Sequence, residues 1–218
     1  MKQTSVRVPY EPVEVAPVTT NRRVLSKIRT RQKVLEAARQ LFTERGYEAS
    51  TIRDIAKHAG MSTGAVFANF EDKSDLFEAV LMEDMERVAE RMRAAAALEA
   101  PVNDKLLSVF SAGYEYHLEH LPLMQAIIAQ SWLRPLNAEL RARAAAKVLL
   151  GIVGDALRDG SRAGEIQAEF DVRLVSETLW DGYLANYRRA VYDEWGLDTL
   201  RARLADQIDL VLAGLRTK

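Results

Sequence analysis

Hydroxyl, amide and ammonium side chains gather between residues 51 and 73, where together they can hydrogen-bond a polyanion. They are Thr51, Ser62, Thr63, Asn69 and Lys73. A hydroxyl or an ammonium group suits a phosphate oxygen, and an amide can pair with the edge of a base such as adenine. The same side chains also occur on ordinary solvated surfaces. The elements that position them must therefore decide between the two interpretations.

A second group with possible chemistry is the histidine pair His117 and His120, three residues apart. One helical turn would place both rings on the same side, as a metal site requires. The chain has three histidines and no cysteine, and no third ligand stands at a suitable spacing, so we expect neither a metal site nor a cofactor. We also find no Ser/His/Asp arrangement and no glycine-rich phosphate loop. The sequence therefore favours a protein that is not an enzyme.

The polar positions fall in a segment with the pattern of a helix-turn-helix. Thr51 opens a short helix, and Asp54 follows three residues later as in a capping box. Gly60 lies in the next turn, where glycine permits a left-handed backbone. Ser62 then caps a second short helix. A short helix, a glycine-containing turn and a second short helix are the elements of this motif.

The second short helix, from Ser62 to about Phe70, has two contrasting faces. Val66 and Phe70, at i and i+4, are expected to anchor it to the core. The side chains on or near the opposite face are Thr63, Ala65, Phe67 and Asn69. A face this short and uncharged is poor as a solvated surface and suits insertion into the major groove of DNA.

The charge distribution supports a polyanion-binding segment. Between Asn21 and Gly60 there are 10 Lys or Arg residues and 4 acidic residues, a net charge of +6. From Leu76 to the end there are 17 basic and 22 acidic residues, a net charge of −5. A basic segment on an acidic body indicates two modules with different tasks.

Apolar residues at helical spacing predict an all-α fold of about nine helices, with no strand and no repeat. We expect helices at about 29–46, 51–60, 62–70, 72–98, 103–120, 123–132, 137–162, 172–194 and 198–215. Prolines interrupt residues 1–28, which we interpret as a disordered tail whose basic end is a possible DNA-contacting arm. Residues 29–75 are then the helix-turn-helix domain, and residues 76–218 form a second helical domain.

From Arg31 to about Leu81 the chain resembles the TetR family of repressors. The resemblance covers RQKVLEAARQLFTERGYEASTIRDIAKHAGMSTGAVFANFEDKSDLFEAVL without a gap. It implies DNA contacts by Arg29, Thr30, Arg31, Thr51, Ser62, Thr63, Ala65, Phe67, Asn69 and Lys73. The family often has tyrosine where this chain has Phe67. Phenylalanine cannot make the hydrogen bond that a tyrosine hydroxyl could give to a phosphate, so Phe67 is expected either to make an apolar contact with DNA or to pack in the core.

The remainder of the chain resembles the family only in the number and order of its helices. The resemblance implies a small-molecule effector in the second domain, and aromatic and amide groups on apolar helices suit a largely apolar ligand. The expected effector contacts are Tyr114, His117, Gln125, Trp132, Trp180, Tyr183 and Tyr187. It also implies a homodimer through the last two helices. The expected seam is the stripe Leu200, Leu204, Ile208, Val211 and Leu215, for which the alternative is packing in the core of the same chain.

The sequence therefore predicts a cytoplasmic regulator, most simply a repressor that an effector releases from a pseudo-palindromic double-stranded operator. No apolar run approaches the roughly 20 residues that span a bilayer. Three alternatives stay open: an activator or effector-independent DNA-binding protein, a ligand-binding protein whose helix-turn-helix no longer engages DNA, and a helical enzyme.

Overall fold

The computed structural model describes residues 22–216, and in this part of the chain the regular structure is entirely helical. The nine helices are α1 (Arg22–Ala49), α2 (Ile52–His58), α3 (Thr63–Phe67), α4 (Lys73–Ala96), α5 (Val102–Leu118), α6 (Leu121–Ser131), α7 (Leu136–Arg162), α8 (Val172–Tyr192) and α9 (Leu197–Ala213). The predicted all-α class and helix order are thus confirmed. None of these helices contains a stretch that is both apolar and long enough to cross a bilayer.

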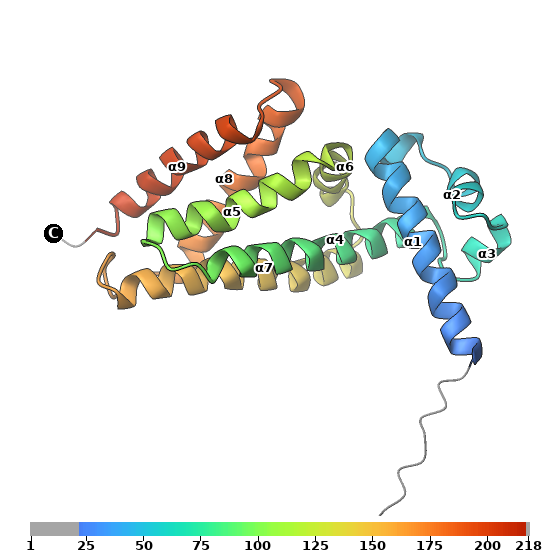
Figure 1. Ribbon diagram of the computed structural model, residues 1–218, viewed down its shortest axis with the longest axis horizontal. Coiled ribbons are helices and arrows are strands. Elements are labelled where there is room, and N and C mark those ends of the chain that lie inside the picture. Colours follow the sequence, from blue (N-terminus) through green and yellow to red (C-terminus); the bar gives the residue numbers. More distant parts are fainter. Residues whose placement is uncertain (1–21, 217–218) are drawn as a thin grey trace, which may run out of the picture.

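The helices form a small unit at one end and a larger body behind it (Figure 1). Helices α2 and α3 lie beyond α1, and α1 packs on α4 and α6 of the body. Helix α4 leads from the small unit into the body, where it packs on α5 and α7. The expected division between residues 75 and 76 falls inside this continuous helix.

Helix α1 begins earlier than the sequence indicated. We expected a tail up to residue 28, but the backbone is helical from Arg22 onwards; the rest of that tail, residues 1–21, lies outside the described part. No proline or glycine occurs between Pro17 and Gly46, so nothing in the backbone prevents the longer helix. The predicted stop at Gly46 is confirmed, because this residue has φ 80° and interrupts the helical geometry.

Side-chain caps and one glycine fix the helix-turn-helix. The Thr51 hydroxyl accepts a hydrogen bond from the Asp54 N–H, and the Ser62 hydroxyl accepts one from the Ala65 N–H, as predicted. Gly60 has φ 69°. Its N–H donates to the Lys57 carbonyl, and the Met61 N–H donates to the Ala56 carbonyl. This is a Schellman motif, which ends α2 and turns the chain into α3.

The apolar stripe of α9 does not form the dimer seam that we expected. Leu200, Leu204 and Ile208 are buried within the chain's own core, where α9 packs on α5 and α8. Val211 and Leu215 are partly buried against the same core. The stripe is apolar because the helix must cover its own domain, so any dimer seam must use other residues.

Two glycines of α7 make a matched test of packing in the body. A Cβ on Gly160 would lie 2.6 Å from Cβ and Cγ2 of Val102, whereas a Cβ on Gly151 would meet no atom within 4 Å. Gly160 therefore lets the start of α5 approach α7 closely, and Gly151 lies in open space.

We predict that Gly160→Ala lowers the free energy of unfolding by about 1–3 kcal/mol, because the branched Val102 side chain cannot move aside freely. Gly151→Ala should raise it by up to about 1 kcal/mol, since alanine favours the helix. Urea denaturation at one fixed protein concentration measures both. Equal effects of the two substitutions would contradict the close approach.

Candidate nucleic-acid interface and internal cavity

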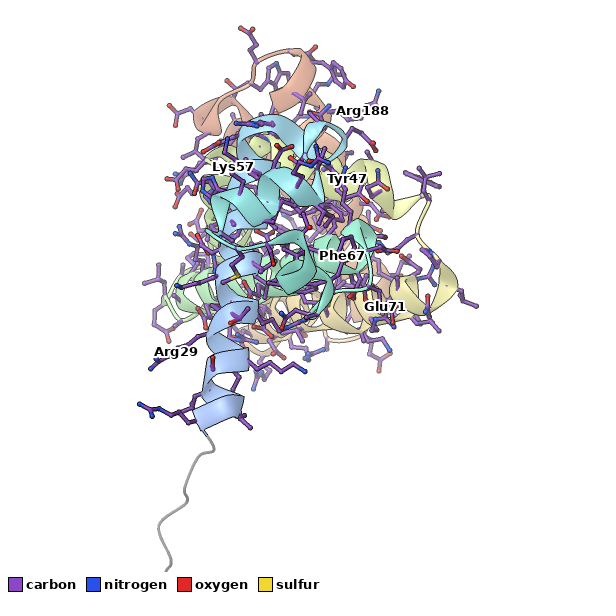
Figure 2. All side chains as sticks on the ribbon, turned by 90° about the vertical axis from the view of Figure 1, so that its right-hand side faces the viewer. Arg29, Tyr47, Lys57, Phe67, Glu71 and Arg188 are labelled. Carbon is purple, nitrogen blue, oxygen red and sulfur yellow. The ribbon has the colours of Figure 1, made fainter. Side chains whose placement is uncertain are left out.

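Helix α3 presents one buried and one exposed side, as its sequence pattern predicted. Val66 and Phe70 are buried against the core of the small unit. Thr63 is exposed, and Phe67 is 55% exposed although its ring is apolar. Phe67 lies at the end of the molecule that is formed by α2 and α3 (Figure 2). The alternative that Phe67 packs in the core is therefore wrong.

Asn69 and Ala65 are less available than the sequence indicated. Both are half-buried, and the Asn69 amide nitrogen donates to the Ala65 carbonyl over 2.9 Å. The Asn69 side-chain oxygen is buried without a hydrogen-bond partner among the described residues. A bidentate contact to adenine needs both amide atoms to face the groove. In this structure Asn69 instead stabilises the end of α3.

Arg31 joins α1 to the end of α3. Its guanidinium donates to the Asn69 carbonyl over 3.0 Å and lies 4.2 Å from the centre of the Phe70 ring. The exposed Arg29 and the half-buried Thr30 precede it on α1. Arg31 therefore positions α3, in addition to the phosphate contact that the resemblance implies.

Lys73, the first residue of α4, is folded onto α1. Its ammonium lies 4.1 Å from the centre of the Tyr47 ring and 3.4 Å from the Glu48 carbonyl oxygen, to which it donates. Partial burial lowers the pKa of Lys73, and the nearby Glu48 carboxylate opposes that shift. To bind a phosphate, the Lys73 side chain would have to leave the Tyr47 ring, or the phosphate would have to lie at the edge of that ring.

Two basic residues near α3 were counted in the charge excess but received no role from the sequence. Arg53 and Lys57 are exposed on α2, and Lys57 lies at the same end of the molecule as Phe67 (Figure 2). Their spacing of i and i+4, on the side of α2 away from the buried Ile55 and Ala56, was the signal that could have identified them. Such a pair suits the phosphates that flank an inserted helix.

The larger body contains a cavity of about 360 Å³ between α4, α5, α6, α7 and α8. Its walls are mainly apolar, and representative residues are Leu81, Val88, Met124, Ile127, Leu149 and Leu184. Three arginines also line it, of which Arg143 and Arg188 are exposed and so lie at its opening. A cavity of this kind fits a largely apolar ligand that keeps an anionic group near solvent.

The floor of the cavity is polar because Asp84 and His117 lie there. Asp84 is 1% exposed, and its carboxylate accepts from the Tyr116 hydroxyl over 2.8 Å and faces His117 Nε2 at 3.1 Å. Desolvation by burial is the main reason that the pKa values of Tyr116, Tyr183 and Tyr187 are raised, so these hydroxyls stay protonated. The sequence analysis missed Asp84, although its spacing from Leu81 and Val88 places it, unlike Glu83 and Glu86, on the inward stripe of α4.

The structure brings together four of the seven residues that we expected to contact an effector. His117, Trp132, Trp180 and Tyr183 line the cavity. Tyr114 and Tyr187 lie in the buried layer behind it, and Gln125 is exposed on α6 outside it. Helical spacing placed these residues on the right helices but did not give their distance from the cavity.

The histidine pair His117 and His120 takes part in contacts within the larger body. No group of three His, Cys, Asp or Glu side chains within residues 22–216 is arranged to hold a metal ion. His117 instead bonds Asp84 and Tyr187, and the His120 ring stacks on Tyr116 with centroids 4.9 Å apart. His117 is therefore a hydrogen-bonding residue, and His120 is a packing residue.

Comparison with known proteins agrees with both parts of this description. The family model "Bacterial regulatory proteins, tetR family" matches residues 34–80, and "YsiA-like protein, C-terminal region" matches residues 81–191. The fatty acid metabolism regulator protein of Bacillus subtilis (strain 168) is 28% identical over 193 residues, which cover 85% of this chain and 95% of the relative. The HTH-type transcriptional repressor KstR2 of Rhodococcus jostii (strain RHA1) is 29% identical over 163 residues, covering 69% and 76%.

Solved structures show the same architecture. The crystal structure of the transcriptional regulator FadR from Bacillus subtilis in complex with stearoyl-CoA matches with a TM-score of 0.70 and 26% identity, over 85% of this chain and 99% of that chain. The motif around Gly60, the exposed face of α3 and the two family models lead to one assignment. The chain belongs to the TetR family of bacterial regulatory proteins and is a DNA-binding transcriptional regulator.

Proposed function

We propose that this regulator is a cytoplasmic repressor without enzymatic activity, which binds a pseudo-palindromic operator as a homodimer and is released by a long-chain acyl thioester. The observation that carries the DNA-binding part is the exposed side of α3, where Thr63 and the half-exposed Phe67 face outwards while Val66 is buried. The basic excess of residues 21–60 supplies the attraction to phosphates.

The proposed DNA contacts fall into two groups. Thr63 and Phe67 would enter the major groove, where an aromatic ring can contact a thymine methyl. Phosphates would be bound by Arg29, Thr30, Thr51, Ser62, Arg53, Lys57 and Lys73. The exposed caps Thr51 and Ser62 stand at helix N-termini, whose free N–H groups attract anions.

The proposed effector class rests on the shape and chemistry of the cavity. Its apolar walls suit an acyl chain, and Arg143 and Arg188 at its opening suit the phosphates of a coenzyme A head. The complex of the related FadR with stearoyl-CoA supports the same class and supplies a probe.

The proposed dimer seam is the outward side of α8 and α9. Leu174 and Tyr192 on α8 and Leu210 on α9 are large, apolar and exposed in the single chain. Their burial against a second copy would form a four-helix seam. A two-fold dimer would present two α3 helices to half-sites about 34–36 Å apart, or multiples of that distance.

We predict that Phe67→Ala weakens binding to the operator by at least about 10-fold, or roughly 1.4 kcal/mol. The operator is selected by the wild-type protein from random-sequence duplexes, and affinity is measured by fluorescence anisotropy. Because Phe67 is 55% exposed, its removal should change the unfolding free energy by less than about 0.5 kcal/mol. The control is Leu98→Ala, an equally exposed apolar side chain on the body. Unchanged affinity for Phe67→Ala would refute this DNA face.

For the effector, stearoyl-CoA should bind the wild-type protein, change Trp180 fluorescence and lower operator affinity about 5- to 150-fold. Ala146→Trp fills the cavity from α7 and should abolish this response while DNA binding persists. The matched control is Ala144→Trp, which is exposed on the same helix and does not line the cavity. A full response in Ala146→Trp would contradict binding in this cavity.

For the dimer, Leu210→Glu should shift the protein towards monomers in sedimentation velocity, because a carboxylate would be buried at the seam. Leu140→Glu, on the outward side of α7, is the matched control, since Leu140 is also large, apolar and exposed. Dissociation by Leu140→Glu alone would place the seam on α7 instead.

A further inference from the structure

A continuous chain of hydrogen bonds connects α1 with the floor of the cavity. Arg39 Nη1 on α1 lies 3.4 Å from the Tyr116 hydroxyl on α5. That hydroxyl lies 2.8 Å from Asp84 Oδ1 on α4, and Asp84 Oδ2 lies 3.1 Å from His117 Nε2. His117 Nδ1 lies 2.8 Å from the Tyr187 hydroxyl on α8. All five side chains are buried. We call this chain the polar relay.

The donors and acceptors of the polar relay have one consistent arrangement when His117 is neutral. Arg39 can only donate, so the Tyr116 hydroxyl accepts from it and gives its single hydrogen to Asp84. The Asp84 carboxylate then accepts from both Tyr116 and His117 Nε2. His117 Nδ1 accepts from the Tyr187 hydroxyl. Each member therefore depends on the protonation and position of its neighbour.

Arg39 has few other partners for its charge. It is 5% exposed, and its Nε lies 3.9 Å from the exposed Glu36 carboxylate. Within the described part of the chain, Nε and Nη2 have no hydrogen-bond partner. A buried guanidinium needs nearby negative charge, and the Asp84 carboxylate, one hydroxyl away, is a buried source of it. The position of Arg39 therefore depends on Tyr116 and Asp84.

The two ends of the polar relay lie where a regulator needs them. Asp84 and His117 line the cavity, so a bound ligand can contact them directly. Arg39 lies on the helix that holds α3, because α1 supplies Arg31 to Asn69 and Phe70. A change at the cavity floor can thus reach the DNA face without a large displacement in between.

We infer that Tyr116 is a positioning residue that transmits occupancy of the cavity to α1. A ligand that contacts Asp84 or His117 competes with the Tyr116 hydroxyl for the carboxylate. Arg39 then loses its link to the buried Asp84 carboxylate and keeps only the exposed Glu36. As a result, α1 shifts on α4 and α6 together with α3. The intact polar relay is the DNA-binding state. The part that concerns a ligand rests on the proposed effector.

The test compares two tyrosines of α5. Tyr116→Phe removes the hydroxyl of the polar relay but keeps the ring, which stacks on His120 and faces Arg91. Tyr114→Phe removes an equally buried hydroxyl two residues away, which bonds the Tyr183 carbonyl and Asn186 and lies outside the relay. Neither residue lines the cavity. A general loosening of the core would affect both variants alike.

Without ligand, Tyr116→Phe should bind the selected operator at least about 5-fold more weakly than wild type, the lower limit of typical coupling between sites. Amide hydrogen exchange in α1 around Arg39 should become faster in the same variant. Tyr114→Phe should match wild type in both measurements. Arg39→Met combined with Tyr116→Phe should cost no more than Tyr116→Phe alone, because both break the same link.

With stearoyl-CoA, the ratio of operator affinities without and with the ligand should be at least about 5-fold smaller in Tyr116→Phe than in wild type. Binding of the ligand, followed by Trp180 fluorescence, should persist. If stearoyl-CoA does not change the operator affinity of wild type, the proposed effector is wrong. The measurements without ligand still test the polar relay in that case. The inference is overturned if Tyr116→Phe and Tyr114→Phe behave alike in operator affinity and in exchange of α1.

Discussion

The position of the exposed side of α3 depends on the burial of Val66 and Phe70 in the core of the small unit. Helix α3 has only five residues, and a helix this short has no stability of its own in water. The Ser62 cap, the two buried side chains and the Arg31 bridge hold it in place. Whatever orients α1 therefore orients the exposed side of α3.

Helix α1 is in turn oriented by the larger body. Phe42 of α1 and Phe77 of α4 pack edge to face with ring centroids 5.4 Å apart, and Tyr47 lies against both rings. This apolar contact joins α1 to α4, and the polar relay separately joins α1 to α5 through Arg39. An apolar contact is not directional, whereas hydrogen bonds depend on exact partners. Under the proposed relay, a ligand changes the orientation of α1 without separating the units.

Local features of the fold were predictable from the sequence, because each depends on a few neighbouring residues. Thr51, Ser62 and Gly60 act through their own backbone and the next turn, and all three have the predicted capping or turn geometry. The predicted start of α1 was wrong. The lack of proline and glycine after Pro17 permits a helix but does not show where it begins. The stripe of α9 was assigned to a partner because periodicity shows which side is buried but not what covers it.

The cavity was only partly predictable for a related reason. Helical spacing gives the direction of a side chain on its own helix, and whether it reaches a cavity depends on the packing of five helices. Trp180 and Tyr187 share a helix and were expected together, yet only Trp180 lines the cavity. Asn69 was expected to contact DNA, at a base or a phosphate, and its bond to the Ala65 carbonyl is a contact that sequence does not reveal.

The most direct test of the central claim is photo-crosslinking from position 67. Benzoylphenylalanine is placed at Phe67, and in a separate protein at the buried Phe110, and each is irradiated with the selected operator. The account predicts a DNA adduct from position 67 that is lost at high salt, and none from position 110. Crosslinks from position 67 only to the protein itself would contradict the claim that this side of α3 enters the groove.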